Sequence, residues 1–272
     1  MPRPVVFLTD FGWEDAFVGI CHGVLARGSP SSNVIDLAHT VPPQDVRRGA
    51  LLLARSVPYM PADAVYLAVV DPGVGTDRRS VALETVSGAV MVGPDNGLLS
   101  MAWAAAGGVA RAVRITSEQV ILRPTAPTFH GRDVFAPAAG HVAAGGRLED
   151  LGPDVEPSTL VMLSAPAPDV RPGVVRCEVM GIDRFGNVEL SSGEAALADA
   201  GIDESSAIEV EGPVGGTALV RARTFGEVAP GDAALIVDSS GWLAVVVNGG
   251  NAAEGFGLSI GDAVILRGAA DR

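Results

Sequence analysis

One short stretch places an acid and two arginines close together after an apolar run. Residues 70–80 read VDPGVGTDRRS and carry Asp71, Arg78 and Arg79. An acid that follows a buried strand in a glycine-containing turn keeps its carboxylate at the edge of the sheet, where open α/β proteins bind their ligands. A neighbouring guanidinium holds such a carboxylate ionised. We therefore expect Asp71 to line a site with Arg78 or Arg79 as its partner; a surface turn with solvated arginines is the alternative.

Two other stretches of the first half carry candidate polar groups. In FLTDFGWEDAFVG, Asp10 ends an apolar strand and Asp15 precedes a helix. Asp10 is expected to contact a ligand, whereas Asp15 suits a ligand contact and a helix N-cap equally well. In PTFHGRDVF, His130 and Gly131 stand just before another helix. Histidine offers an acid–base group near neutral pH, and the glycine lets a ligand approach the backbone.

The residue inventory excludes several kinds of chemistry. All 19 basic residues are arginine, which excludes a Walker-type phosphate loop, a Schiff-base lysine and any pyridoxal phosphate enzyme. His22, His39 and His141 lack HxxxH or HExxH spacing. We expect them to make structural hydrogen bonds, and we expect no catalytic metal. Cys21 and Cys177 lie far apart in apolar surroundings and are expected to be buried thiols in a reducing compartment.

Composition limits the partners of the protein. The 272 residues are 48% hydrophobic, which is enough for a sizeable core. A net charge of −13 repels phosphate backbones and anionic lipid, so neither nucleic acid nor a membrane is an expected partner. No window approaches the roughly 20 apolar residues of a membrane span, and the start MPRPVVFLTDFG lacks the features of a secretory signal. We expect a cytoplasmic protein that acts on a small molecule.

The order of the elements predicts two domains of different class. In residues 1–165, apolar strand-like runs such as VVFLT and NVIDL alternate with helical patterns. This alternation predicts an N-terminal α/β domain with a central, mostly parallel sheet. Residues 166–173 are proline-rich and are expected to be a linker. In residues 174–272, short β-rich runs between glycine turns, such as VVRCEVMGI and WLAVVV, predict a smaller C-terminal all-β barrel.

Polar residues gather at strand ends of this second domain, in GIDRFGNVELS and VDSSGWLAVVVNGGNAAEG. Their side chains could bind a small zwitterion or the edge of a base. Taken singly, each is also an ordinary β-turn residue. The candidates are Asp183, Asn187, Ser239, Ser240 and Asn251.

Six motifs resemble those of the S-adenosyl-L-methionine (SAM) hydrolases, also called hydroxide adenosyltransferases, which are relatives of fluorinase and chlorinase. The motifs are, in order over nearly the whole chain, TDFGxxDxFVG, VVDPGVGTxRR, GPDNGLLS, TFHGRD, IDRFGN and SSGWLxxxVNGGNAA. The resemblance implies an enzyme that hydrolyses SAM to adenosine and L-methionine, with SAM as its substrate and no cofactor. It also implies an N-terminal α/β domain, a C-terminal β-barrel, and a homotrimer with each site between one subunit's N-domain and its neighbour's C-domain.

The resemblance further implies roles for individual residues. Asp71, Arg78 and His130, here called the hydrolytic set, would prepare a water molecule; the halogenases carry other residues at the first and last of these positions. Asp10 would bind the ribose hydroxyls. Gln44 stands where halogenases have an aromatic residue, so its contact stays open. Methionine would meet Asp15, Asp183, Asn187 and Ser239, and adenine would meet Asn251 and Ala253.

The chemistry that this resemblance implies is attack on C5′ of SAM, with neutral methionine sulfur as the leaving group. No general acid is needed, but water must be oriented and must lose a proton, which Asp71 and His130 could bring about. The sequence leaves open which of them takes the proton. Halide transfer to C5′ is one alternative, although a carboxylate near the nucleophile repels an anion. A non-catalytic module that binds SAM or adenosine is another, as is a structural trimer without activity.

Overall fold

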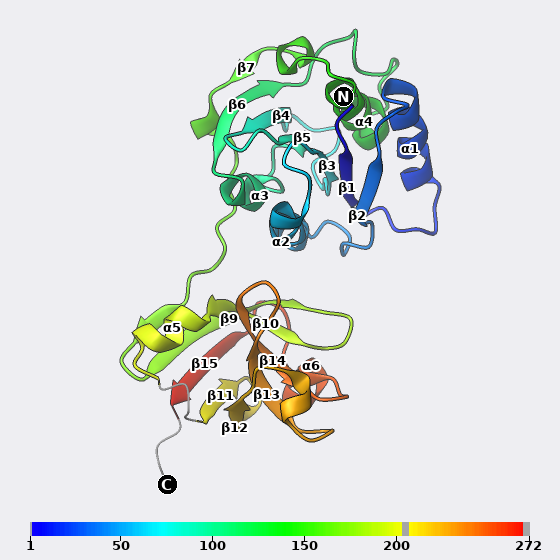
Figure 1. Cartoon of the computed structure of the whole chain (residues 1–272). Helices are drawn as coiled ribbons and strands as arrows, with labels where there is room; N and C mark the ends of the chain where they lie inside the picture. Colours follow the sequence, from blue (N-terminus) through cyan, green and yellow to red (C-terminus); the bar gives the residue numbers. More distant parts are fainter. Residues whose placement is uncertain (1, 203–206, 269–272) are drawn as a thin grey trace. The chain divides into compact units, whose positions relative to one another are not determined.

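The chain folds into two compact units. The computed structural model describes residues 2–202 and 207–268, and the units comprise Met1–Ser164 and Ala165–Arg272. Figure 1 shows that the first unit combines helices and strands, whereas the second is built mainly of strands.

A seven-stranded sheet forms the centre of the first unit, in the order β2-β1-β3-β5-β4-β6-β7. The first four strands in this order are parallel to one another. β4 is antiparallel to both neighbours, so β6 again shares the direction of the parallel group. The strands are β1 (Val5–Thr9), β2 (Val34–Ala38), β3 (Val65–Val69), β4 (Ser80–Thr85), β5 (Val90–Pro94), β6 (Val109–Arg114) and β7 (Asp154–Val155).

Helices cover both faces of this sheet. Along β1, Val5 and Phe7 pack in one apolar cluster with residues of α1 and α4, while Val6 and Leu8 pack in another with residues of α2 and α3. Because alternate strand residues point to opposite faces, a run as apolar as VVFLT requires a layer of helices on each side. The elements are α1 (Phe17–Gly28), α2 (Val46–Ser56), η1 (Val57–Tyr59), α3 (Ser100–Ala105), η2 (Gly131–Phe135), α4 (Ala136–Ala143), η3 (Leu148–Leu151) and η4 (Pro157–Thr159).

The second unit is a seven-stranded barrel, in the order β10-β14-β13-β12-β11-β15-β9, that a β9–β10 pairing closes. Among the strand pairs that the structure describes in this second unit, only β12–β13 is parallel. Closure leaves these strands without a free edge. The elements are β9 (Val174–Ile182), β10 (Val188–Gly193), α5 (Glu194–Asp199), β11 (Ile208–Gly212), β12 (Gly215–Arg221), η5 (Phe225–Glu227), β13 (Ala233–Val237), β14 (Trp242–Val247), α6 (Ala252–Phe256) and β15 (Ala263–Gly268).

These two architectures confirm the predicted fold class, with two local differences. Part of the segment expected as a linker, residues 166–173, forms β8 (Asp169–Arg171), which pairs with the start of β9. Whether a segment forms a β strand depends on its contacts with neighbouring strands more than on its own sequence. Here the edge of β9 provides the neighbouring strand. β10 was likewise not expected as a strand, because its sequence VELSSG is too polar to show the apolar pattern of a strand.

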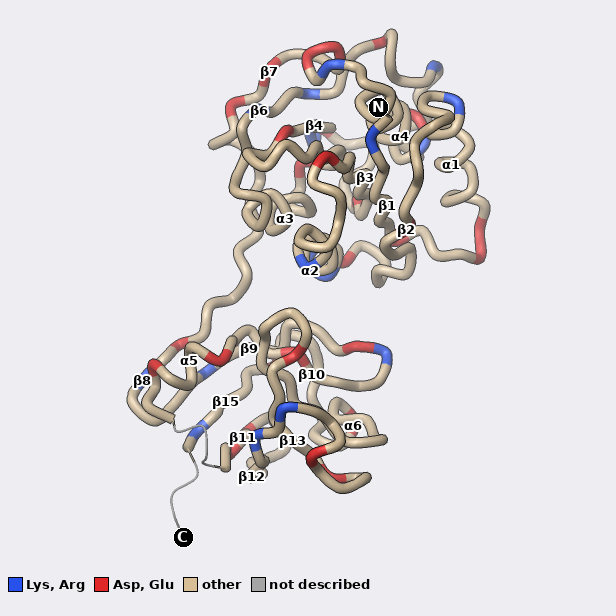
Figure 2. The backbone as a smooth tube through the Cα atoms, viewed as in Figure 1, with Lys and Arg blue, Asp and Glu red and all other residues tan. Residues whose placement is uncertain are grey.

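Charged side chains of both signs are scattered along both units, as Figure 2 shows. Within the described ranges, 2–202 and 207–268, no helix is long and apolar enough to cross a bilayer.

Candidate active site

The ends of two neighbouring parallel strands position the first acids of the site. β1 and β3 pair in parallel, with Thr9 opposite Val69. Asp10 directly follows β1, and Asp71 follows β3 after one further residue. Both acids therefore leave the sheet at the same edge, where its strands end.

The turn after β3 depends on glycine at position 75. Gly75 has a φ of +78°, a backbone conformation that residues with a Cβ atom rarely adopt. A Cβ atom on this residue would lie 2.7 Å from the carbonyl oxygen of Pro127. Thr76 tightens the turn, because its Oγ1 donates to the carbonyl of Gly73 at 2.7 Å. The chain thereby folds back so that Arg78 faces the strand end.

Arg78 joins the members of the hydrolytic set. Its Nε donates to both carboxylate oxygens of Asp71, at 2.9 and 3.0 Å, and its Nη2 donates to Asp71 Oδ2 as well. The same Nη2 donates to Nδ1 of His130 at 2.9 Å. The side chains of Asp71 and Arg78 are only 6% and 10% exposed. The structure brings the three residues together and makes Arg78 the partner of Asp71.

The adjacent Arg79 serves a different carboxylate. Its Nε donates to Asp95 Oδ2 at 2.7 Å, and its Nη1 donates to Thr159 Oγ1 at 3.0 Å. Asp95 also accepts the backbone N–H of Val161 at 2.8 Å. Arg79 therefore fastens a neighbouring segment to the sheet and takes no part in the hydrolytic set.

Two further contacts of Arg78 were not predicted from the sequence. Its Nη1 donates to Ser80 Oγ at 2.7 Å, and its guanidinium carbon lies 5.1 Å from the ring centroid of Phe135. Residues two apart in an extended chain point to the same side, so the spacing of Arg78 and Ser80 was a usable signal. Phe135 comes from a distant segment and left no local signal. Together these contacts fix the plane of the guanidinium.

A π-helical turn carries His130 into the site. η2 begins at Gly131, directly after His130, and continues into α4. Turns of this kind are frequent at functional sites. A Cβ atom on Gly131 would lie 2.9 Å from the ring of Phe11. The missing side chain of Gly131 thus makes room for this ring; the approach of a ligand to its backbone stays a prediction.

Burial and hydrogen bonding set the protonation of His130. Burial lowers the pKa of this histidine, and the charge of Arg78 lowers it too, against the opposing charge of Asp71. A guanidinium can only donate, so Nδ1 of His130 must be the acceptor of its bond from Arg78. The neutral ring then carries its proton on Nε2 and presents an N–H donor there.

Asp10 uses one oxygen to hold a strained residue. Its Oδ2 accepts the backbone N–H of Gln44 at 2.8 Å, and Gln44 has a φ of +66°. A non-glycine residue in this conformation costs about 1–3 kcal/mol and persists only where its surroundings fix it. Within the described part of the chain, Oδ1 of Asp10 has no hydrogen-bond partner, so it is free to meet a ligand.

Asp15 is exposed and does not cap a helix. α1 has Ala16 at its N-cap, and no side chain caps it. Among residues 2–202 and 207–268, Asp15 has no hydrogen bond or ion pair. The N-cap alternative for Asp15 is therefore wrong. The flanking Trp13 and Phe17 are 58% and 43% exposed, so this acid stands in an open apolar surface.

A cavity in the second unit gathers four of the candidate binding residues. It has a volume of about 350 Å³, and its lining includes Asp183, Asn187, Ser239 and Ser240. Arg223 and Phe225 line it as well and were not predicted. They add a cation and an aromatic ring to a polar pocket, yet their run RTFGE has no distinguishing motif.

Asp183 organises the turn between β9 and β10. Its Oδ1 accepts the backbone N–H groups of Phe185 and Asn187 at 2.8 and 3.0 Å, and its Oδ2 accepts Nδ2 of Asn187 at 2.8 Å. This is an ordinary turn role for aspartate. Oδ2 still has an unused lone pair that can accept a ligand.

Asn251 and Ala253 contact the same turn. Asn251 caps α6: its Oδ1 accepts the backbone N–H of Glu254 at 3.1 Å, and its Nδ2 donates to Glu254 Oε1 at 2.9 Å. The N–H of Ala253 donates to the carbonyl of Gly186 at 3.0 Å. Neither residue lines the 350 Å³ cavity. The two expected adenine contacts are thus grouped with each other rather than with the cavity.

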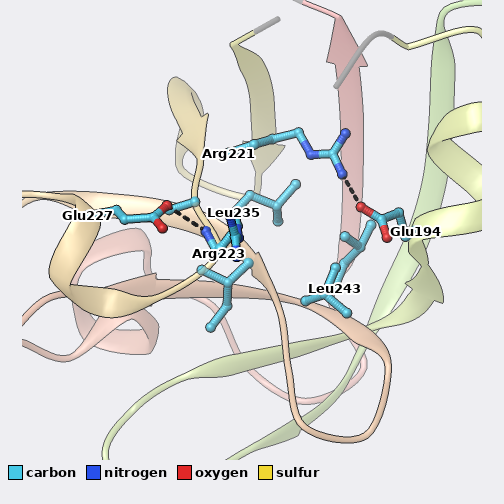
Figure 3. A pocket seen from close by; sticks show the side chains of 9 residues that line it. Glu194, Arg221, Arg223, Glu227, Leu235 and Leu243 are labelled. Carbon is cyan, nitrogen blue, oxygen red and sulfur yellow. Dashed lines mark hydrogen bonds and ion pairs between the residues drawn. The ribbon is translucent and has the colours of Figure 1, made fainter. Parts of the chain in front are cut away.

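A second cavity of this unit, of about 440 Å³, holds none of the expected site residues. Figure 3 shows Arg221 reaching toward Glu194, with which it forms an ion pair at 2.5 Å. The backbone N–H of Arg223 bonds to Glu227 Oε2 at 2.9 Å. Since the charge of Arg221 is already paired, this cavity is a weaker candidate for an anionic ligand.

The remaining histidines make hydrogen bonds to carboxylates. Nε2 of His22 and Nε2 of His39 both lie near Oδ1 of Asp36, at 2.8 and 3.0 Å. His141 pairs with Asp150 at 3.3 Å. Burial lowers the pKa of His39, so its ring is neutral. The grouping of His22 with His39 had no signal in their sequence spacing.

Both cysteines are free and buried, as predicted. Burial raises the pKa of Cys21 and that of Cys177 to about 12. Neither is a thiolate at neutral pH, so neither can act as a nucleophile.

Both units match models of one protein family. Residues 5–152 match the SAM hydroxide adenosyltransferase N-terminal domain, and residues 177–265 match the SAM hydroxide adenosyltransferase C-terminal domain. The chain belongs to the SAM hydroxide adenosyltransferase family. The family that the six motifs indicated is thereby confirmed.

Several proteins are similar to this chain over almost their whole length. A protein of Salinispora tropica named (R)-S-adenosyl-L-methionine hydrolase is 51% identical over 264 residues, which cover 96% of this chain and 97% of the relative. A fluorinase of Actinoplanes is 27% identical, over 94% of this chain and 95% of the relative. A crystal structure of an uncharacterized conserved protein from Thermotoga maritima has a TM-score of 0.91 and 32% identity, over 97% of this chain and 99% of that one.

Proposed function

We propose that this enzyme hydrolyses SAM to adenosine and L-methionine, as the name of its 51% identical relative states for that protein. The observation that carries the proposal is the closed contact of Asp71 and His130 with Arg78. Water attacks C5′, so that a C5′–O bond forms while the C5′–S bond breaks. The electron pair of the broken bond stays on the methionine sulfur, and one proton of the water is released.

The leaving group decides what the residues have to do. Methionine departs as a neutral thioether, so no side chain needs to protonate it. The remaining difficulty is the nucleophile, because water must be oriented and must lose a proton as it attacks. These are tasks for the hydrolytic set.

The hydrogen bonds suggest how the set divides this work. The Nε2–H of neutral His130 is a donor, so it orients the oxygen of the water and does not take its proton. Asp71 is the carboxylate of the set and accepts the proton. Arg78 holds Asp71 in place, and its charge stabilises the developing hydroxide.

Groups of both units would hold the substrate. Oδ1 of Asp10 suits the ribose hydroxyls, and the unpaired carboxylate of Asp15 suits the methionine amine. In the 350 Å³ cavity, Asp183, Asn187 and Ser239 match an amino acid that carries both charges. Asn251 and Ala253 are proposed to meet adenine.

We further propose a homotrimer in which the two halves of a site come from different subunits. A subunit with Asp71→Asn and a subunit with Ser239→Trp should each be inactive, but mixed trimers of the two should regain activity. Light scattering should give three chains per particle. An active monomer, or a mixture that stays inactive after subunit exchange, contradicts this assembly.

The test of the reaction itself is product analysis. Purified protein and SAM should give adenosine and L-methionine in equal amounts. SAM that is bound but recovered intact would instead support a binding module. A chlorinated nucleoside at high chloride would support halide transfer, which the buried carboxylate of Asp71 disfavours because it repels an anion.

A further inference from the structure

A group of metal-ligand side chains lies outside the hydrolytic set. It consists of His22 on α1, Asp36 on β2 and His39 just after β2, and one ligand atom from each lies within 4.8 Å of the others. Both imidazoles direct Nε2 at the same carboxylate oxygen. Two imidazoles and one carboxylate are a set that binds zinc and similar divalent ions.

We propose that this group, here called the α1–β2 site, binds one Zn²⁺ ion. A tetrahedral zinc with bonds of about 2.0–2.1 Å keeps its ligand atoms about 3.3 Å apart. Asp36 Oδ1 already lies 2.8 Å from Nε2 of His22 and 3.0 Å from Nε2 of His39. Each imidazole nitrogen needs to move away from this oxygen by only a few tenths of an ångström to admit the ion, and the two nitrogens lie within 4.8 Å of each other.

The backbone prepares this geometry. Phe7 pairs with Asp36 while Leu8 pairs with Ala38, so the register of β1 and β2 shifts by one residue at this point. In a regular strand, residues three apart face opposite sides, and an inserted residue re-aims the chain. The irregularity therefore allows Asp36 and His39 to meet on one side of the edge strand.

A second layer of contacts supports the ligands. Nδ1 of His39 lies 2.8 Å from Oγ1 of Thr9, and this ring is fully buried. When a neutral histidine gives its Nε2 lone pair to a metal, its proton moves to Nδ1 and needs an acceptor, which Thr9 provides. His22 and Asp36 are 34% and 32% exposed, which leaves the fourth position open to water.

The α1–β2 site would fasten the loop that carries Asp15. The carbonyl of His39 accepts the N–H of Gly12 at 2.8 Å, and the His39 ring packs edge-on against Trp13 at 4.7 Å. An ion that holds His39 to α1 and β2 would therefore restrict the loop from two sides. This role is independent of the hydrolytic chemistry.

The experiment uses tag-free, full-length protein after treatment with a chelator. Titration calorimetry with ZnCl₂ should give one ion per chain, and Co²⁺ should give the visible absorption of a nitrogen- and oxygen-ligated ion. His22→Gln and Asp36→Asn should each weaken Zn²⁺ binding at least tenfold. Both positions are partly exposed, so circular dichroism should show that the variants fold.

His141→Gln is the matched control, because His141 is partly exposed and pairs with the carboxylate of Asp150, but among the described residues it belongs to no group of three metal-ligand side chains. Its affinity for Zn²⁺ should equal that of the unaltered protein. Zinc should also raise Tm in the unaltered protein and in His141→Gln, but not in His22→Gln. Absence of stoichiometric binding, or equal binding in His22→Gln, overturns the proposal.

Discussion

The two units of this enzyme prepare their functional residues in opposite ways. In the first unit, Asp71 and Arg78 are nearly buried and bond to each other and to His130. In the second unit, Ser239 is exposed and Asp183 bonds mainly to the backbone of its own turn. The groups proposed for chemistry are thus fixed before substrate arrives, whereas the groups proposed for binding stand open to it.

The architecture of each unit explains this difference. Parallel strands end together, so a turn from one strand and a π-helical turn from a distant segment can converge at one sheet edge. A closed antiparallel barrel offers hairpin turns instead, and each turn uses its polar side chains to satisfy its own backbone. Segments that meet at the sheet edge of the first unit favour rigid catalytic contacts. The hairpin turns of the barrel favour adaptable surface contacts.

Removing members of the hydrolytic set should have the largest effect. Asp71→Ala and Arg78→Ala should each lower kcat by roughly 10² or more, the usual contribution of positioned proton-transfer groups. KM should change far less, because the proposed substrate contacts lie elsewhere. Steady-state assays of the two variants measure both constants.

Arg79→Lys is the control for Arg78→Ala, since Arg79 pairs with Asp95 outside the set. It should keep kcat within about twofold. The double variant of Asp71 and Arg78 should lose no more than the worse single variant, because the pair acts as one unit. Additive losses would show that the two residues act separately.

The next effect separates the roles of His130. His130→Gln keeps an N–H donor near the position of Nε2, so it should retain clearly more activity than His130→Ala. If His130 were the base that takes the proton, the two variants would be equally impaired. Comparison of their kcat values decides between these roles.

The pH profile tests the same residue. Burial holds the pKa of His130 below its usual 6.5. As the pH falls below 6.5, the unfolded chain takes up this proton before the folded one, so the free energy of unfolding should decrease. Activity should fall only at still lower pH, when Nδ1 is protonated and loses its bond from Arg78. His130→Gln should remove that acid limb of kcat/KM.

A smaller effect is expected from the open surface of the second unit. Ser239→Ala should raise KM for SAM by about tenfold, the loss of one hydrogen bond to a charged group, with kcat nearly unchanged. Ser259→Ala, at another exposed turn, should leave KM unaltered. Equal effects of the two variants on KM would show that the 350 Å³ cavity is not part of the substrate site.

No effect is expected from the thiols. The pKa of Cys21 and that of Cys177 are raised to about 12 by burial, so a thiol reagent should leave activity intact. Both should react once denaturant unfolds the chain. Rapid labelling of the native protein would contradict their burial.

Periodicity and strand-end acids were enough to predict the α/β unit, the barrel and the edge that carries Asp10 and Asp71. What could not be predicted are contacts between distant segments. Nothing local indicated that Phe135 stacks on Arg78, or that His22 and His39 share a carboxylate. For Asp15 the sequence could not separate a helix N-cap from a free carboxylate, because both place an acid just before a helix.

Attack of water on C5′ is tested most directly by the origin of the new oxygen atom in adenosine. When the reaction runs in water enriched in heavy oxygen, mass spectrometry should find the label in the 5′-hydroxyl of adenosine, one atom per molecule. Attack at C5′ makes that C–O bond anew, whereas the methionine carboxylate should stay unlabelled. Adenosine that carries no label would mean that water does not attack C5′, and the role assigned to Asp71, Arg78 and His130 would be wrong.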